Sequence, residues 1–229
     1  MRFYIRLILF FLLVSLWSCQ KDEETTGITN VENAYFPIQI GHWISYQIQE
    51  INIDQESAVN DTVSYQIKEK IESLVEKTEQ YKTYRLERYF RHNETEDWSI
   101  LNVWQIRQYT TRIHKIEENI EYIRLVTPVK INRNWDGNTY NNLEAQVYQI
   151  SYMTDSIVKN QNQKIAVVTQ DNRESLIDKH LSQEQYATSI GLIKKVNIDV
   201  ELNIDPNLPW EQKITKGTIY YQDLIDTNE

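Results

Sequence analysis

The sequence predicts a mainly β fold: an antiparallel meander curled into a barrel or half-barrel, or folded as a sandwich, with at most one or two short helices. Three observations predict it. Apolar and polar side chains alternate over many short runs, turn-forming residues separate these runs, and residue types that favour strands, above all tyrosine (15 residues), are abundant. A sheet with one apolar face has to be covered or closed on itself.

The alternating runs mark the expected strands in order. The clearest run covers residues 196–204, where valine, isoleucine and leucine alternate with asparagine, aspartate and glutamate. Shorter runs of the same kind lie at 44–48, 84–90, 148–152 and 165–169. An alternation that repeats every two residues gives each strand one apolar and one solvated face, as in antiparallel sheets. From the number of such runs we expect about ten strands.

Turn signals separate the runs at hairpin-like intervals. They are Asn60-Asp61, His92-Asn93-Glu94, Asp136-Gly137-Asn138, Asn160-Gln161-Asn162 and Asp205-Pro206-Asn207. Two segments keep a helical alternative. Residues 63–77 carry apolar side chains at a spacing that also suits a helix, and residues 171–186 could form a short surface helix.

The first residues have the order of a secretory signal peptide. Arg2 and Arg6 precede an apolar run over residues 7–17, and the small Ser18 follows. A membrane-spanning helix needs roughly 20 apolar residues, whereas this run has about eleven. We therefore expect residues 1–18 to be a cleaved signal peptide.

Cys19 is the only cysteine in the chain, and it directly follows Leu16-Trp17-Ser18. This stretch resembles a lipobox, although Trp17 is bulkier than the residue usual at its position. The resemblance implies cleavage before Cys19 and lipidation of its thiol, including palmitate. Several acyl chains would make attachment to the membrane effectively permanent. The alternative is a plain secretory signal followed by an unmodified thiol.

The five residues after the cysteine are Gln20, Lys21, Asp22, Glu23 and Glu24. They resemble the export signal of Bacteroidota lipoproteins, which implies an outer-membrane protein facing the cell surface. The alternative is an ordinary solvated tether on a protein that faces the periplasm. In either case the expected membrane contact is the lipid anchor.

Composition supports one folded domain after the anchor. We expect residues 19–34 to be a lipidated flexible tether and residues 35–229 to be a single β-rich domain. Without residues 1–18 the chain keeps 22 basic and 33 acidic residues, a net charge of −11. Nucleic acid binding requires clustered cations, so we expect no nucleic-acid partner.

Residues 35–46, YFPIQIGHWISY, resemble the start of the domain in an uncharacterised family of Bacteroidota outer-membrane and surface lipoproteins. Residues 125–138 (LVTPVKINRNWDGN) and 186–194 (YATSIGLIK) resemble later parts of that family. In this chain Ile131-Asn132 stand where the family has a small residue. The resemblance implies an envelope location and a β-rich domain, but no reaction.

No catalytic, cofactor or metal site is expected from the motifs. His42, His92, His114 and His180 lie at no zinc-ligand spacing, and the chain has neither a nucleophile elbow nor a phosphate-binding glycine loop. The sequence thus favours a non-enzymatic binding or structural lipoprotein of unknown glycan or protein ligand. Two alternatives are an accessory glycan-binding or glycan-cleaving lipoprotein of an outer-membrane uptake system, and a lipid-carrier half-barrel.

Overall fold

The computed structural model describes residues 34–228, and this range is almost all β-sheet. The strands are β1 (Trp43–Asp54), β2 (Val59–Lys77), β3 (Tyr81–Arg91), β4 (Ser99–Tyr109), β5 (Arg112–Glu117), β6 (Ile120–Val126), β7 (Asn134–Asp136), β8 (Val147–Val158), β9 (Gln161–Glu174), β10 (Asp178–Ala187), β11 (Gly191–Leu202) and β12 (Ile214–Thr227). A 3-10 turn, η2 (Trp210–Gln212), precedes β12. Within the described range no helix is long and apolar enough to cross a membrane.

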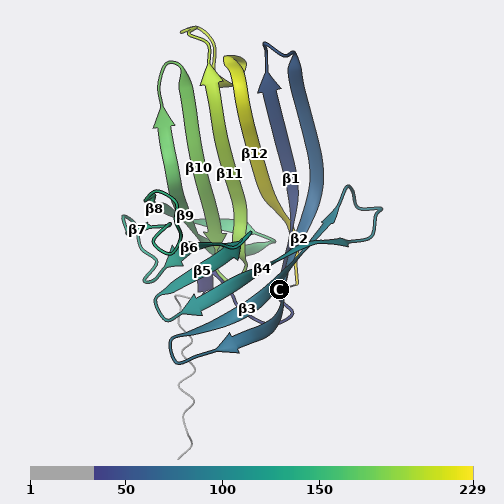
Figure 1. The fold of residues 1–229 in the computed structure, drawn as a ribbon, viewed down its shortest axis with the longest axis vertical. Helices are drawn as coiled ribbons and strands as arrows, with labels where there is room; N and C mark the ends of the chain where they lie inside the picture. The colour runs from purple at the N-terminus through teal and green to yellow at the C-terminus, as the bar shows by residue number, and fades with distance from the viewer. Residues whose placement is uncertain (1–33, 229) are drawn as a thin grey trace, which may run out of the picture. The chain divides into compact units, whose positions relative to one another are not determined.

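The twelve strands form one antiparallel sheet in the order β6-β5-β4-β3-β2-β1-β12-β11-β10-β9-β8-β7 (Figure 1). Strands that follow each other in the chain pair with each other, except β6 and β7, and β1 also pairs with β12. The sheet therefore consists of two six-stranded meanders joined edge to edge. This confirms the predicted antiparallel meander, with twelve strands rather than about ten.

The two outer edges of this sheet, β6 and β7, approach each other and nearly close a barrel. The Ile123 N–H donates to the carbonyl of Gly137, just after β7, at 3.0 Å. The indole Nε1 of Trp135 donates to the Ile123 carbonyl at 2.9 Å. Nearby, Arg112 donates to the Tyr140 hydroxyl at 2.8 Å. Of the three predicted architectures, the barrel is the one observed.

Both segments with a helical alternative are strands. Residues 63–77 lie within β2, which pairs with β1 on one side and β3 on the other. Residues 171–186 contain the end of β9, a turn and most of β10. The predicted turn at Asn60-Asp61 is wrong, because these residues pair with Ile53 and Asn52 inside the β1–β2 hairpin. The chain turns at 55–58 instead.

Apolar side chains fill part of the barrel. The inner cluster is Tyr35, Ile71, Tyr84, Leu86, Ile106, Ile113, Leu125, Tyr148, Ile150, Ala166, Val168 and Tyr186. Phe36 and Ile38, from the segment before β1, pack against it. The alternation predicted at 148–152 fails at its last residue: Tyr152 is exposed because a bulge after Ile150 shifts the register.

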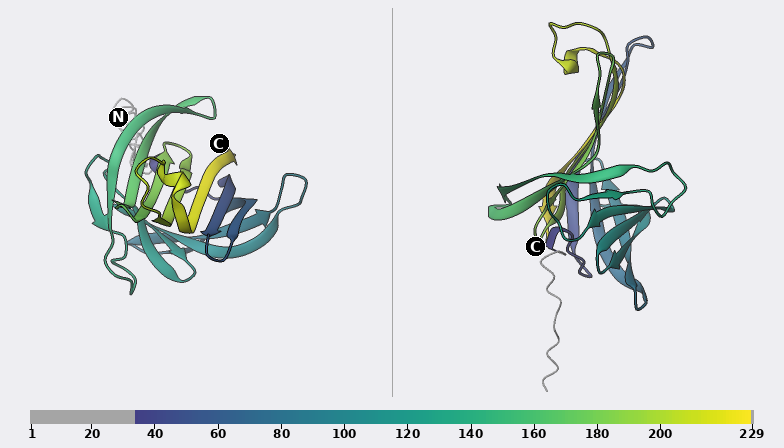
Figure 2. Two further views of the ribbon diagram at one scale, coloured as in Figure 1. Left: turned by 90° about the horizontal axis from the view of Figure 1, so that it is seen from above. Right: turned by 90° about the vertical axis from the view of Figure 1, so that its left-hand side faces the viewer.

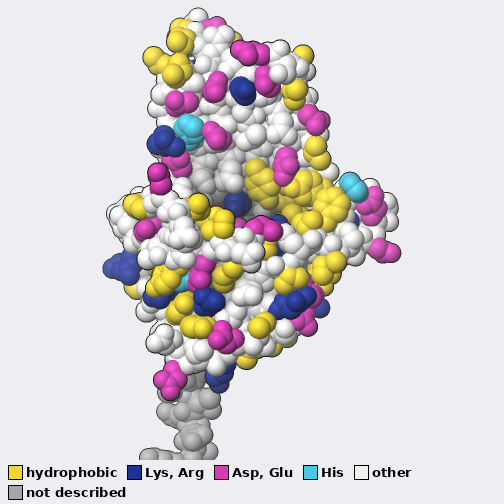
Figure 3. Space-filling view, in the orientation of Figure 1, with side chains coloured by type: hydrophobic (Ala, Val, Ile, Leu, Met, Phe, Trp, Pro, Cys, Tyr) yellow, Lys and Arg dark blue, Asp and Glu magenta, His cyan; other side chains and the backbone are white. Residues whose placement is uncertain are grey.

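The long strands β1, β2, β10, β11 and β12, with the end of β9, extend beyond the level of β3–β6 as a single layer (Figure 1 and Figure 2). One face of this extension carries an apolar cluster that includes Val196, Ile198 and Ile219, with Trp210 packed against it. The other face continues the barrel interior. Along β10 and β11 this face is a polar wall, which carries the cross-strand pairs Ser182–Asn197 and Glu184–Lys195. Beside this wall a patch of hydrophobic side chains is visible in Figure 3.

Candidate functional site

The site residues predicted from sequence lie outside the described range. They are the lipidated Cys19 and the export-signal residues 20–24. The same holds for the signal peptide and for the tether, apart from Ala34. These assignments stay predictions.

A cavity of about 90 Å³ lies inside the barrel, which is room for several waters. Figure 3 shows that the front face of the described unit is hollowed below the long strands, with basic side chains visible in the hollow. The charged residues that line the cavity are Glu69, Arg88, Lys115, Glu117, Arg124, Glu184 and Lys195.

One group of these side chains, the Glu69 cluster, consists of Glu69, Arg88 and Lys115 from β2, β3 and β5. Lys115 Nζ lies 2.9 and 3.0 Å from the two Glu69 oxygens, and Arg88 Nε donates to the same carboxylate at 3.0 Å. Trp104 packs beside both cations: its ring centre lies 3.6 Å from the Arg88 guanidinium carbon and 4.7 Å from Lys115 Nζ. These cation–π contacts leave little of Trp104 free for a ligand to stack on.

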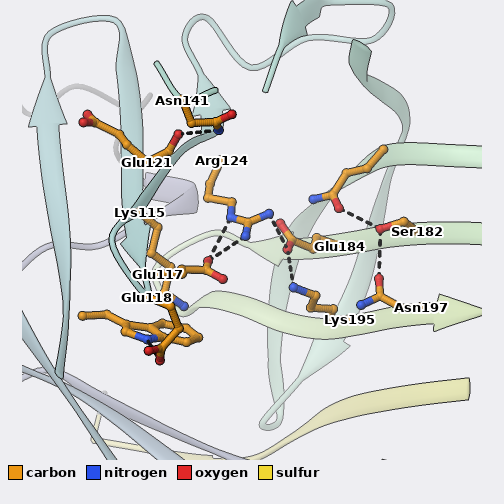
Figure 4. A network of polar contacts seen from close by, with 12 residues as sticks. Lys115, Glu117, Glu118, Glu121, Arg124, Asn141, Ser182, Glu184, Lys195 and Asn197 are labelled. Carbon is orange, nitrogen blue, oxygen red and sulfur yellow. Dashed lines mark hydrogen bonds and ion pairs between the residues drawn. The ribbon is translucent and has the colours of Figure 1, made fainter. Parts of the chain in front are cut away.

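The second group, the Arg124 cluster, brings together Glu117, Arg124, Glu184 and Lys195 (Figure 4). Arg124 donates to Glu117 at 2.7 and 3.0 Å, and its third nitrogen lies 3.6 Å from Glu184. Lys195 Nζ lies 3.3 Å from Glu184. The Tyr186 hydroxyl donates to the other oxygen of Glu184 at 2.6 Å.

Both buried carboxyl groups are held ionised. Burial alone would raise the pKa of Glu184, but Arg124, Lys195 and the Tyr186 hydroxyl outweigh it and bring the pKa down to about 2. Burial opposes ionisation of Glu69 in the same way, and Lys115 and Arg88 lower its pKa. A general acid needs a carboxyl that keeps its proton near neutral pH. Neither Glu69 nor Glu184 meets that requirement.

The depressed pKa of Glu184 predicts a specific loss of stability in acid. Its pKa is about 2 in the folded protein and near 4.5 in a free side chain, so its contribution is present above about pH 4.5 and disappears as the pH falls toward 2. This difference in pKa corresponds to a loss of unfolding free energy on the order of 3 kcal/mol. We expect urea unfolding of Glu184→Gln to depend less steeply on pH between 2.5 and 5 than unfolding of the natural protein. The exposed Glu211→Gln is the control, and parallel curves for all three proteins would contradict the assignment.

A group of amide and hydroxyl side chains, the Ser182 cluster, lies next to Glu184 and Lys195 on the same face. Glu184 and Lys195 form one cross-strand pair of β10 and β11, and Ser182 and Asn197 form the next pair on the same face. The Ser182 hydroxyl lies 2.9 Å from the amide oxygen of Asn197. The hydroxyl also lies 2.7 Å from the amide oxygen of Gln170. The amide nitrogen of Gln170 is buried without a hydrogen-bond partner, and the residue as a whole is only 7% exposed.

Exposed tryptophans could form a stacking platform for a glycan, but the tryptophans of this barrel have separate partners. Trp135 packs against Tyr148, Trp210 against the outer apolar cluster and Trp104 against the Glu69 cluster. Arg91 and Lys68 lie over the ring of Trp98, at 4.3 and 4.7 Å from its centre. These contacts occupy the aromatic surface that a flat glycan-binding platform would need.

Comparison with known proteins adds a weak structural likeness. No protein-family model matches the chain, and no curated protein matches it in sequence. Among solved structures it is similar to a "putative lipoprotein" from Parabacteroides distasonis ATCC 8503, with 10% sequence identity, a TM-score of 0.41 and coverage of 85% of this chain and 98% of that chain. A likeness of this size carries no conclusion about function.

Proposed function

We propose that this protein is a non-enzymatic binding lipoprotein that holds a small polar ligand inside its barrel. The observation that carries the proposal is the cavity itself, which reaches the charged side chains of both clusters. Removing the seven charged side chains from water costs free energy when the barrel folds. Replacing buried ion pairs with apolar residues is often neutral or stabilising, so the fold does not need these charges. A ligand that uses these charges gives them a role that the fold alone does not require.

The chemistry of the lining argues against a lipid carrier and against glycan cleavage. A lipid carrier needs an apolar cavity. Apolar side chains such as Phe36, Ile71 and Leu86 line part of this one, but four cations and three carboxylates line the rest. Glycosidic cleavage by the usual carboxylate pair needs a carboxylic acid with a raised pKa. The two buried carboxyls whose pKa is shifted, Glu69 and Glu184, are both shifted downward.

We further propose that the domain is tethered to the outer membrane by lipid on Cys19 and faces the cell surface. The lipobox-like Leu16-Trp17-Ser18-Cys19 supports the anchor, and the patch at 20–24 supports surface exposure. A periplasm-facing protein is the alternative, and protease treatment of intact cells separates the two. Digestion places the domain outside; protection places it inside.

The binding proposal is tested by thermal shift of the full chain in detergent, against a panel of small acids, neutral sugars, amines and peptides at millimolar concentration. We expect at least one ligand to raise the melting temperature of the natural protein, as mass action requires for a ligand of the folded state. Ile106→Trp should abolish this shift, because Ile106 lines the cavity and a larger side chain fills it.

The matched control is Ile100→Trp, which makes the same substitution on the same strand at a side chain that is 60% exposed. It should keep the full shift. Circular dichroism of both variants serves to check that they fold. If no ligand of the panel shifts the natural protein, or if Ile106→Trp folds and keeps the shift, the cavity is not a binding site and the barrel is structural.

A further inference from the structure

The Glu69 cluster contains one carboxylate and two cations, so it carries one net positive charge in the barrel interior. Its side chains are nearly buried: Arg88 and Lys115 are each 10% exposed and Glu69 is 12% exposed. The Arg124 cluster is balanced, with two carboxylates and two cations. The whole cavity lining therefore keeps an excess of one positive charge, although the chain as a whole has a net charge of −9.

The neighbouring carboxylates have other partners. Glu117 accepts two hydrogen bonds from Arg124. Glu118, at the β5–β6 turn, accepts hydrogen bonds from Asn102 and from the indole Nε1 of Trp104. The second partner of Arg88 is the neutral amide oxygen of Asn102, at 3.3 Å. Because both of its donors are neutral, Glu118 keeps its negative charge, but it is exposed and water screens it. The excess positive charge of the Glu69 cluster is buried, and a bound anion would supply a buried counter-charge.

The Ser182 cluster shows a second unmet need on the same face. Its one hydroxyl proton cannot serve both the Gln170 and the Asn197 oxygen, so one of these two amides is turned round. If the Gln170 amide is turned round, its nitrogen donates to the Ser182 hydroxyl, but its oxygen then takes the buried position without a partner. In either orientation one atom of this amide lacks a hydrogen bond. A ligand hydroxyl can donate or accept, so it would satisfy either end of this amide once the buried side chain turns toward the polar wall.

We infer that the ligand is a small polyhydroxylated carboxylate of the sugar-acid class, with its carboxylate held by Arg88 and Lys115 and its hydroxyls directed toward Ser182, Asn197 and Gln170. This inference rests on the proposed binding function and names the chemistry of the same site. A carboxylate held by a guanidinium and an ammonium group accepts charge-assisted hydrogen bonds, which are stronger than hydrogen bonds between neutral groups. Part of the ligand enters the cavity and the rest extends along the polar wall of β10 and β11.

Isothermal titration of the full chain in low-salt zwitterionic buffer, with four probes, tests the inference. D-glucuronate carries both the charge and the hydroxyls, D-glucose carries hydroxyls alone, and acetate and inorganic phosphate carry negative charge without the sugar. We expect D-glucuronate to bind about tenfold or more tightly than each of the other three, since one charge-assisted contact supplies a difference of this order.

Charge-changing variants of the Glu69 cluster have opposite expected effects. Lys115→Met brings the cluster to zero net charge, so glucuronate binding should weaken roughly thirtyfold or more. Glu69→Gln brings it to two positive charges, so binding should tighten while the ligand-free protein melts earlier. Lys70→Met removes the same charge from the residue beside Glu69, outside the cavity lining, and should change neither.

Each result has a definite meaning. Equal affinity for acetate, phosphate and glucuronate overturns the hydroxyl part, and equal affinity for glucose and glucuronate overturns the charge part. If Lys115→Met lowers stability and leaves glucuronate binding unchanged, the cluster is a structural ion-pair group and the inference is wrong. If none of the four probes binds while another panel ligand still does, the inference fails and the binding function stands. If no panel ligand binds at all, both fail.

Discussion

Arg124→Met is expected to destabilise the folded protein by about 3–5 kcal/mol at pH 7, the cost of breaking a buried ion pair from one side. The guanidinium is 7% exposed and is the main partner of Glu117, while Glu184, at 3% exposure, keeps only Lys195 as a cation. For a domain of this size the loss corresponds to a fall in melting temperature of about 10 °C. Urea unfolding measures the free energy directly.

The pH dependence of this variant provides an internal check. Without Arg124 the Glu184 carboxyl takes up a proton at higher pH than in the natural protein, and a neutral carboxyl is less costly to bury. The difference in unfolding free energy between the variant and the natural protein should therefore be smaller at pH 4 than at pH 7. Arg133→Met, at an exposed position, should stay within about 0.5 kcal/mol. A loss below about 1 kcal/mol for Arg124→Met would mean that water solvates the cluster well enough to replace the guanidinium.

Cys19→Ser is expected to abolish lipid attachment completely, because serine offers no thiol for acylation. The variant should incorporate no radiolabelled palmitate, escape cleavage by lipoprotein signal peptidase and leave the membrane fraction on carbonate extraction. Persistent palmitate labelling would show that Cys19 is not the anchor and would favour a plain secretory signal with an unmodified thiol.

The export patch supplies the matched control for the anchor. Alanines at residues 21–24 should leave palmitate labelling intact, since Cys19 and the preceding residues are unchanged. Protease accessibility on intact cells should nevertheless be lost if this patch directs the domain to the surface. Unchanged accessibility would remove the export-signal assignment and leave the lipid anchor in place.

The strands were predictable wherever the apolar face is uninterrupted. Ile44, Tyr46 and Ile48 in β1 are buried as their alternation predicts, and so are Val196 and Ile198 in β11. In these segments local preference and tertiary packing agree, so one sequence suffices to find them. The closure of the sheet was not predictable, because it depends on contacts between the edge strands β6 and β7 that leave no local pattern.

The candidate site was missed because its charges occupy inward positions of these same strands. In β3 the run Tyr84, Leu86, Phe90 omits position 88, which is Arg88, and this omission was the available signal. In β2 Glu69 stands between Ile67 and Ile71, so the apolar spacing becomes four residues and imitates a helix. A charged residue inside an otherwise apolar strand face marks either a buried ion pair or a site, and sequence alone does not separate them.

The pairing of β1 with β12 determines when the protein can finish folding. The N-terminal meander, β1–β6, keeps the edge of β1 unpaired until β12 has been synthesised, because 11 residues of β1 find their partners on that strand. Contacts between positions so distant in the chain slow folding and leave a sheet edge open to other chains. We therefore expect nascent or truncated chains that lack β12 to depend on chaperones and to aggregate, whereas the complete chain shields that edge in its own interior.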